Sequence, residues 1–191
     1  MAVSEVELVD VIERSSLDLA DRLWRESGSV YPPTVHLLSK HADPSYLGSV
    51  ATRPFYRGAD AAHAVTMLGL LPSVVSATRL VVVWEHTDLA AALESPEALD
   101  GELPNGLVVV DALVSSHVVR WHGVGFRVGL AGEDMLIPEW RTVVEHPGGR
   151  LPEPVADLLE LWRQWRRGDE SQVVAELRSA GFTVTWTAGA A

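Results

Sequence analysis

Two valine-rich runs in the middle of the chain predict the centre of a β-sheet. The first, Leu80–Trp84, ends at the polar segment Glu85–Asp88, and the second, Leu107–Val110, ends at Asp111. Short apolar runs that are rich in β-branched residues and bounded by polar residues are typical of strands buried on both faces. We therefore predict two neighbouring central strands in a sheet that is at least partly parallel.

Amphipathic patterns before this centre predict helices and a hairpin that pack on the sheet. Ser4 and Glu7 have the spacing of a capping box, and the apolar residues that follow predict a helix over 5–26. The segment 34–53 predicts a β-hairpin, and 60–71 predicts a second helix that ends at a proline.

The pattern after the second valine run changes to a period of two. Apolar residues alternate with glycine and arginine over 124–130, and His122-Gly123 has the composition of a turn. We therefore predict an antiparallel hairpin near 117–130 with one apolar face. The segment 133–149 is ambiguous, because Pro138 suits either the start of a short helix or a loop.

The last part of the chain predicts two helices and a strand. Helical spacing after Leu151 places Trp162 and Trp165 on one apolar stripe, and Asp169 has the position of an N-cap for the next helix. Alternating apolar residues and threonines over 182–187 predict a strand added to a sheet edge or to a partner.

Together these elements predict an α/β protein with a central mixed sheet of about six or seven strands and helices packed on it. The glycines that precede Arg150 mark the best boundary. We divide the chain into an α/β domain over 1–149 and a helix-helix-strand extension over 150–191 that packs on the same core.

Composition narrows the classes of function. The chain of 191 residues has no cysteine, which excludes disulfides, thiolate catalysis and zinc-thiolate sites. Its formal net charge of −11 disfavours binding to nucleic acid, which depends on clustered Lys and Arg. Neither a long apolar run nor a basic leader is present, so we expect a soluble cytoplasmic protein without membrane contact. Lys40 is the only lysine, a bias that we attribute to a GC-rich bacterial genome.

The polar ends of the two valine runs are the best candidates for chemistry. If the strands are parallel neighbours, Glu85, His86, Asp88 and Asp111 meet at one edge of the sheet, where they suit a hard metal ion or general-base catalysis. The alternative is structural: Thr87 or Asp88 caps the following helix and Asp111 begins a turn. A triad of Asp111 with Ser115 and His117 lacks the elbow that exposes a nucleophile.

The order of a helix, a hairpin, a helix and a buried strand that ends in His86-Thr87-Asp88 resembles the MPN (JAMM) metallopeptidase fold. Active members of that family carry His-x-His-Pro and a downstream Ser-x-x-Asp. In this chain Asp88 replaces the second histidine, Leu89 replaces the proline, and Ser95–Ala98 lacks the aspartate. The resemblance implies a degenerate metal site that keeps His86.

The missing catalytic motifs favour a non-catalytic protein-interaction or assembly module without a cofactor. We expect contact with a protein partner or a second copy, as in a homodimer, through the 124–130 strand, the 182–187 strand or the Trp162/Trp165 stripe. The alternative is a metal-assisted hydrolase at the ends of the valine-rich strands. The net charge allows a third function, an acidic decoy for a basic surface.

Overall fold

The computed structural model describes residues 4–94, 105–128, 136–164 and 166–186 as one sheet with helices on both faces, which confirms the predicted α/β class. The helices are α1 (Glu5–Ser27), α2 (Ala59–Thr66), α3 (Leu70–Val74), α4 (His86–Ala92), α6 (Glu153–Arg163) and α7 (Glu170–Ser179), with a 3-10 turn at Met67–Gly69. The strands are β1 (Thr34–Leu38), β2 (Tyr46–Ala51), β3 (Arg79–Glu85), β4 (Gly106–Leu113), β5 (His117–Val128), β6 (Leu136–Trp140), β7 (Val144–Pro147) and β8 (Thr183–Trp186).

The two valine-rich strands β3 and β4 are neighbours, as predicted, but they run in opposite directions. The order is β6-β5-β4-β3-β1-β2-β8, β7 also pairs with β5, and every described pair is antiparallel. The prediction of a partly parallel sheet is therefore wrong. Strands that are buried on both faces can have the same apolar composition in parallel and antiparallel pairs, so the two valine runs do not give the direction of pairing.

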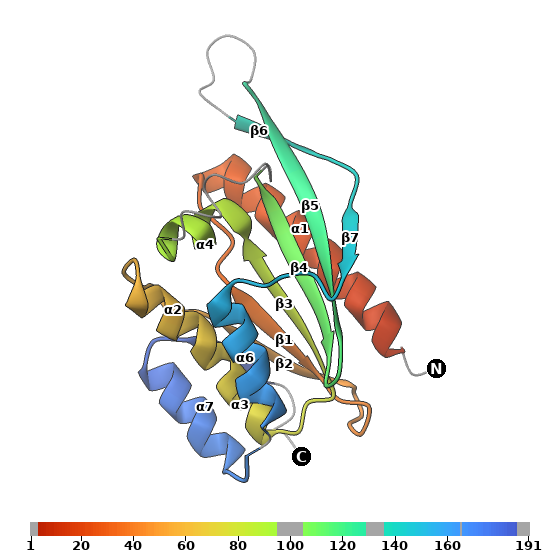
Figure 1. Cartoon of the computed structure of the whole chain (residues 1–191), viewed down its shortest axis with the longest axis vertical. Coiled ribbons are helices and arrows are strands. Elements are labelled where there is room, and N and C mark those ends of the chain that lie inside the picture. Colours follow the sequence, from red (N-terminus) through yellow and green to blue (C-terminus); the bar gives the residue numbers. More distant parts are fainter. Residues whose placement is uncertain (1–3, 95–104, 129–135, 165, 187–191) are drawn as a thin grey trace.

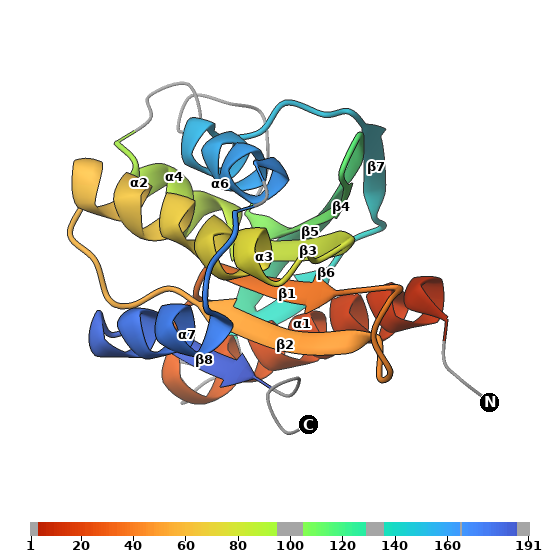
Figure 2. The ribbon, with the colours of Figure 1, turned by 90° about the horizontal axis from the view of Figure 1, so that it is seen from below.

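The sheet separates two cores (Figures 1 and 2). On one face α2, α3 and α6 cover an apolar cluster that includes Val82, Val110 and Leu158. On the other face α1 lies across the sheet over a smaller cluster that includes Val9, Val83 and Val109. Alternate residues of each strand therefore enter different environments, because successive side chains point to opposite faces.

Local signals at the N-terminus act as the sequence predicts. The Ser4 hydroxyl accepts from the Glu7 N–H, the Glu7 carboxylate accepts from the Ser4 N–H, and Gly28 ends α1 in a left-handed conformation.

Strands β1 and β2 form the predicted hairpin. The second predicted helix is divided into α2, the 3-10 turn and α3, and its proline, Pro72, lies inside α3.

An antiparallel hairpin does occur near 117–130, between β4 and β5. The turn predicted at His122-Gly123 is wrong, because β5 runs through both residues as one strand. Its first half pairs with β7 and its second half with β6, while β4 pairs along 117–123. In its described part the segment 133–149 forms β6 and β7, joined by a loop at 141–143, so the predicted helix does not occur there. Figure 1 shows that β6 and the end of β5 project beyond the rest of the sheet.

The C-terminal elements follow the prediction and share the larger core. Asp169 caps α7 by accepting from the N–H groups of Ser171 and Gln172. Strand β8 pairs with β2 at the sheet edge. Val155 and Val184 belong to the same cluster as the valines of the central strands. None of the helices in the described part of the chain combines the length and apolarity needed to cross a bilayer.

Candidate functional site

The structure does not bring the four predicted site residues together. Glu85 ends β3 opposite Leu107, whereas Asp111 lies inside β4 opposite Val81, four residues or about 13 Å further along the strand. The expected meeting of their side chains is wrong, because antiparallel strands deliver their carboxyl ends to opposite edges of the sheet. The alternative prediction, that Asp111 begins a turn, is also wrong, because β4 continues past Asp111 to Leu113.

Asp111 instead belongs to an ion-pair network between α1 and the sheet. Its carboxylate accepts two hydrogen bonds from Arg79, of 2.6 and 2.7 Å, and lies 3.9 Å from Arg120. Arg120 also pairs with Glu13 of α1 at 3.2 Å, and His122 Nε2 lies 2.7 Å from the other oxygen of Glu13. These pairs are largely shielded from water, and those of Glu13 with Arg120 and His122 connect α1 to β5.

His86 and Glu85 are consecutive, yet they lie on opposite faces of the sheet. The His86 ring lies edge-to-face against Trp121, with ring centroids 4.4 Å apart, and Trp121 belongs to the larger core. Within the described residues the indole N–H groups of Trp84 and Trp121 have no acceptor. The described residues also contain no cluster of three His, Asp or Glu side chains suited to a metal ion.

Glu85 points to the α1 face, where it is 9% exposed. Its Oε2 atom accepts a 3.2 Å hydrogen bond from Trp24 Nε1. Burial, followed by repulsion from Asp88, raises the pKa of Glu85 to about 7, although the Trp24 hydrogen bond opposes the shift. Burial also raises the pKa of Asp88, while the nearby Arg57 lowers it. The end of β3 thus holds a carboxylate that is costly to ionise.

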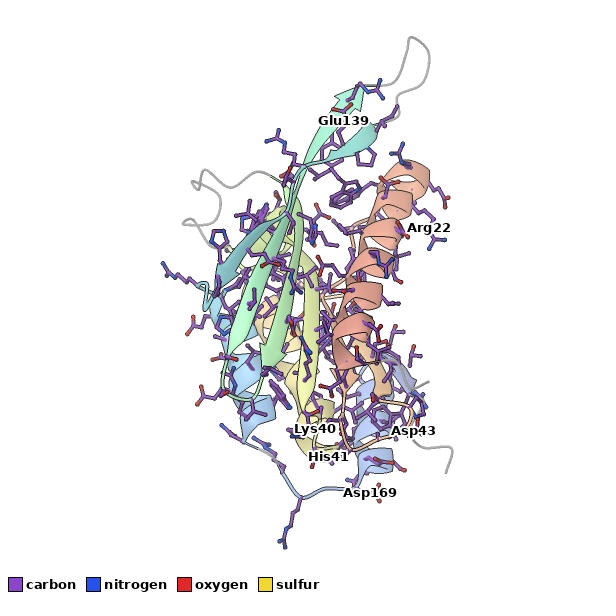
Figure 3. The ribbon with its side chains drawn as sticks, turned by 90° about the vertical axis from the view of Figure 1, so that its right-hand side faces the viewer. Arg22, Lys40, His41, Asp43, Glu139 and Asp169 are labelled. Atoms are coloured by element: carbon purple, nitrogen blue, oxygen red, sulfur yellow. The ribbon has the colours of Figure 1, made fainter. Side chains whose placement is uncertain are left out.

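Trp24 connects Glu85 to an aromatic cluster on the projecting strands. It stacks on Trp140 with centroids 5.2 Å apart and an angle of 27°, and it meets Phe126 edge-to-face at 5.4 Å. Trp140 donates its indole N–H to Asp21 at 3.2 Å. We call Trp24, Phe126 and Trp140 the aromatic end. Figure 3 looks along the gap between α1 and the sheet and places Glu139, the neighbour of Trp140, at this end of the molecule.

The aromatic end has one side chain that solvent reaches readily. Phe126 is 38% exposed, while its neighbours Trp24 and Trp140 are half-buried. The sequence predicts Phe126 within the 124–130 strand. It does not link Trp24 to Trp140, because these two of the seven tryptophans lie 116 residues apart. The only local signal that Trp24 belongs to such a cluster is its position on the predicted helix beside Asp21 and Arg25.

The other two predicted contact surfaces, the Trp162/Trp165 stripe and the 182–187 strand, differ in the structure from what the sequence predicts. Trp162 is fully buried and donates its indole N–H to Ala77 O at 2.9 Å, so its predicted place on a partner surface is wrong. Trp165 lies outside the described residues. Strand β8 is a short edge strand, and Arg178 donates to its Val184 carbonyl at 3.1 Å. An edge carbonyl that is already bonded is less open to strand addition.

No family model matches the chain, and comparisons with curated proteins and with solved structures found no match either. The resemblance to MPN metallopeptidases therefore gains no support from these comparisons. Its downstream motif, Ser95–Ala98, lies outside the described residues.

Proposed function

We propose that the chain is a non-catalytic protein-interaction module that binds its partner through the aromatic end. The observation that carries the proposal is the exposed ring of Phe126 supported by the Trp24–Trp140 stack. Aromatic side chains that are held rigidly provide much of the binding energy at protein interfaces, because they bury a large area and lose little conformational freedom.

The supporting hydrogen bonds are typical of a preorganised surface. Glu85 and Asp21 each accept one of the two indole N–H groups, so both rings are fixed before a partner arrives. Asp21 is held in turn by Arg25, which also donates to the Pro138 carbonyl of β6 at 3.4 Å. A fixed contact surface loses less entropy on binding than a mobile one.

The buried carboxylate supports a functional interpretation of the same place. Glu85 makes no ion pair with any described residue, and ionising it near neutral pH opposes folding. Residues that cost stability concentrate at functional sites, because a requirement other than folding keeps them there. Glu85 therefore joins a buried carboxylate to Trp24, which contacts the exposed ring of Phe126.

The experiment compares Phe126→Ser with Val144→Ser. Each variant removes one exposed apolar side chain from a strand that pairs with or belongs to β5, but only Phe126 lies at the aromatic end. Immobilised protein is exposed to lysate from the source cell, bound proteins are quantified, and light scattering over a range of concentrations tests a second copy of the chain as the partner.

We expect Phe126→Ser to reduce the bound partner, or the self-association, by about tenfold or more, and Val144→Ser to leave it unchanged. Thermal melts of both variants show whether each is folded. A wild-type protein that stays monomeric at all concentrations and retains no partner would contradict the proposal, as would an equal loss in the two variants.

A further inference from the structure

We propose that the aromatic end recognises a cationic side chain of the partner, a guanidinium or ammonium group that lies against Phe126 and compensates the charge of Glu85. This inference rests on the proposed function and names the chemistry of the contact. It is carried by one carboxylate, Glu85, that has no ion-pair partner among the described residues and that binds Trp24, the ring in contact with the exposed Phe126.

The first step concerns charge. The Glu85 carboxylate accepts from a neutral indole and has no described cation as a partner. Three of the basic residues nearby have other acidic neighbours: Arg25 pairs with Asp21 at 2.6 Å, Arg127 pairs with Glu139 at 3.0 Å, and Arg57 acts on Asp88. The carboxylate of Glu85, which holds Trp24 of the aromatic end, therefore has no ion-pair partner among the described residues.

The second step concerns the rings. Cations bind favourably over the faces of tryptophan and phenylalanine, where the electron density is highest. Trp24 contacts Phe126 with its ring and Glu85 with its N–H, so the exposed ring and the carboxylate are separated by a single side chain.

The third step concerns the kind of cation. A small divalent ion would need several oxygen ligands at short distances, and the described residues provide no such cluster. A guanidinium or alkylammonium group has an apolar stem that packs on aromatic rings while its head stays near a carboxylate. The net charge of −11 would also accelerate the approach of a cationic partner.

The test uses two blocked tripeptides of the same length, acetyl-leucyl-arginyl-leucine amide and its glutamine counterpart. They are titrated into the full-length protein while the indole N–H signal of Trp24 is followed by NMR, with Trp24→Phe used to assign that signal. Glu85→Gln removes the proposed charge and keeps an acceptor for Trp24. Asp10→Asn, at an exposed position of the same helix, removes one charge elsewhere and serves as the control.

We expect the arginine peptide to shift the Trp24 signal saturably with an affinity about fivefold or more above that of the glutamine peptide. This preference should disappear in Glu85→Gln and persist in Asp10→Asn. Equal binding of the two peptides, no binding of either, or an unchanged preference in Glu85→Gln would overturn the inference. If partner capture still depends on Phe126 in that case, the proposed function stands and only the cationic contact is rejected.

Discussion

The two faces of the sheet hold α-helices in different ways. The face under α2, α3 and α6 is packed with aliphatic and aromatic side chains such as Leu68, Leu158 and Trp162. The face under α1 contains the buried charged or titratable residues of the described chain, namely Tyr31, Glu85, Asp111 and His122. One face thus contributes mainly stability, while the other places charges in fixed positions.

The difference matters because apolar packing and ion pairs stabilise a protein in different amounts and respond to different conditions. Apolar burial does not depend on the titration of a side chain, and it contributes about 25 cal/mol for each Å² removed from water. A shielded ion pair offers little net stability, but removing one partner leaves the other charge unpaired. Variants on the two faces should therefore differ in both magnitude and pH dependence.

The largest effect is expected on the apolar face. Leu158 is fully buried on α6, so Leu158→Ala leaves a cavity and should lower the free energy of unfolding by about 2–5 kcal/mol. Urea unfolding at pH 6 and pH 8 measures it. The loss should be the same at both pH values, and a strong pH dependence would contradict the assignment of this face.

The next effect is expected in the network under α1. Asp111→Ala leaves Arg79, which is 13% exposed, without its carboxylate partner and should cost about 3 kcal/mol. The same unfolding experiment measures the loss. The double variant Asp111→Ala with Arg79→Met should recover part of it, because the unpaired charge is then gone. A double variant as unstable as the single one would argue that packing, not charge, is responsible.

A gain in stability is expected at Glu85. Its folded pKa of about 7 exceeds the ordinary value of 4.5, so the unfolded state loses its proton first and stability falls as pH rises between these values. Glu85→Gln should therefore be about 2–3 kcal/mol more stable than the wild type at pH 8 and equal to it below pH 4.5.

The difference between Glu85→Gln and the wild type also removes the contribution of a second titrating residue, His36. Burial lowers the pKa of His36 on the same face to about 4, which produces a pH dependence of opposite sign in both proteins. The difference between wild type and Glu85→Gln cancels it. A constant difference from pH 4 to pH 8 would show that Glu85 is not the group that titrates.

The smallest effect is expected for an ion pair on the surface of the projecting strands. Arg127 and Glu139 lie 3.0 Å apart but are 65% and 59% exposed. Glu139→Ala should change the free energy of unfolding by no more than about 0.5 kcal/mol, and less in high salt. Parallel denaturant titrations with Asp111→Ala compare the exposed and the shielded carboxylate directly, and equal losses would remove the distinction.

The sequence by itself determined the elements whose signals are local. The Ser4–Glu7 capping box, the valine runs of β3 and β4, the 34–53 hairpin and the Asp169 cap all depend on residues within a few positions of each other. Such signals act through backbone hydrogen bonds and side-chain periodicity, so they do not require knowledge of the rest of the chain.

Only the tertiary structure decided the direction of the strands and the composition of the candidate site. The apolar composition of β3 and β4 is the same for parallel and antiparallel pairing, so Asp111 was predicted beside Glu85 and lies instead beside Arg79. The partner of Glu85 is Trp24, which is 61 residues away. Contacts over that distance arise from how α1 crosses the sheet, and a pattern along the chain does not contain that geometry.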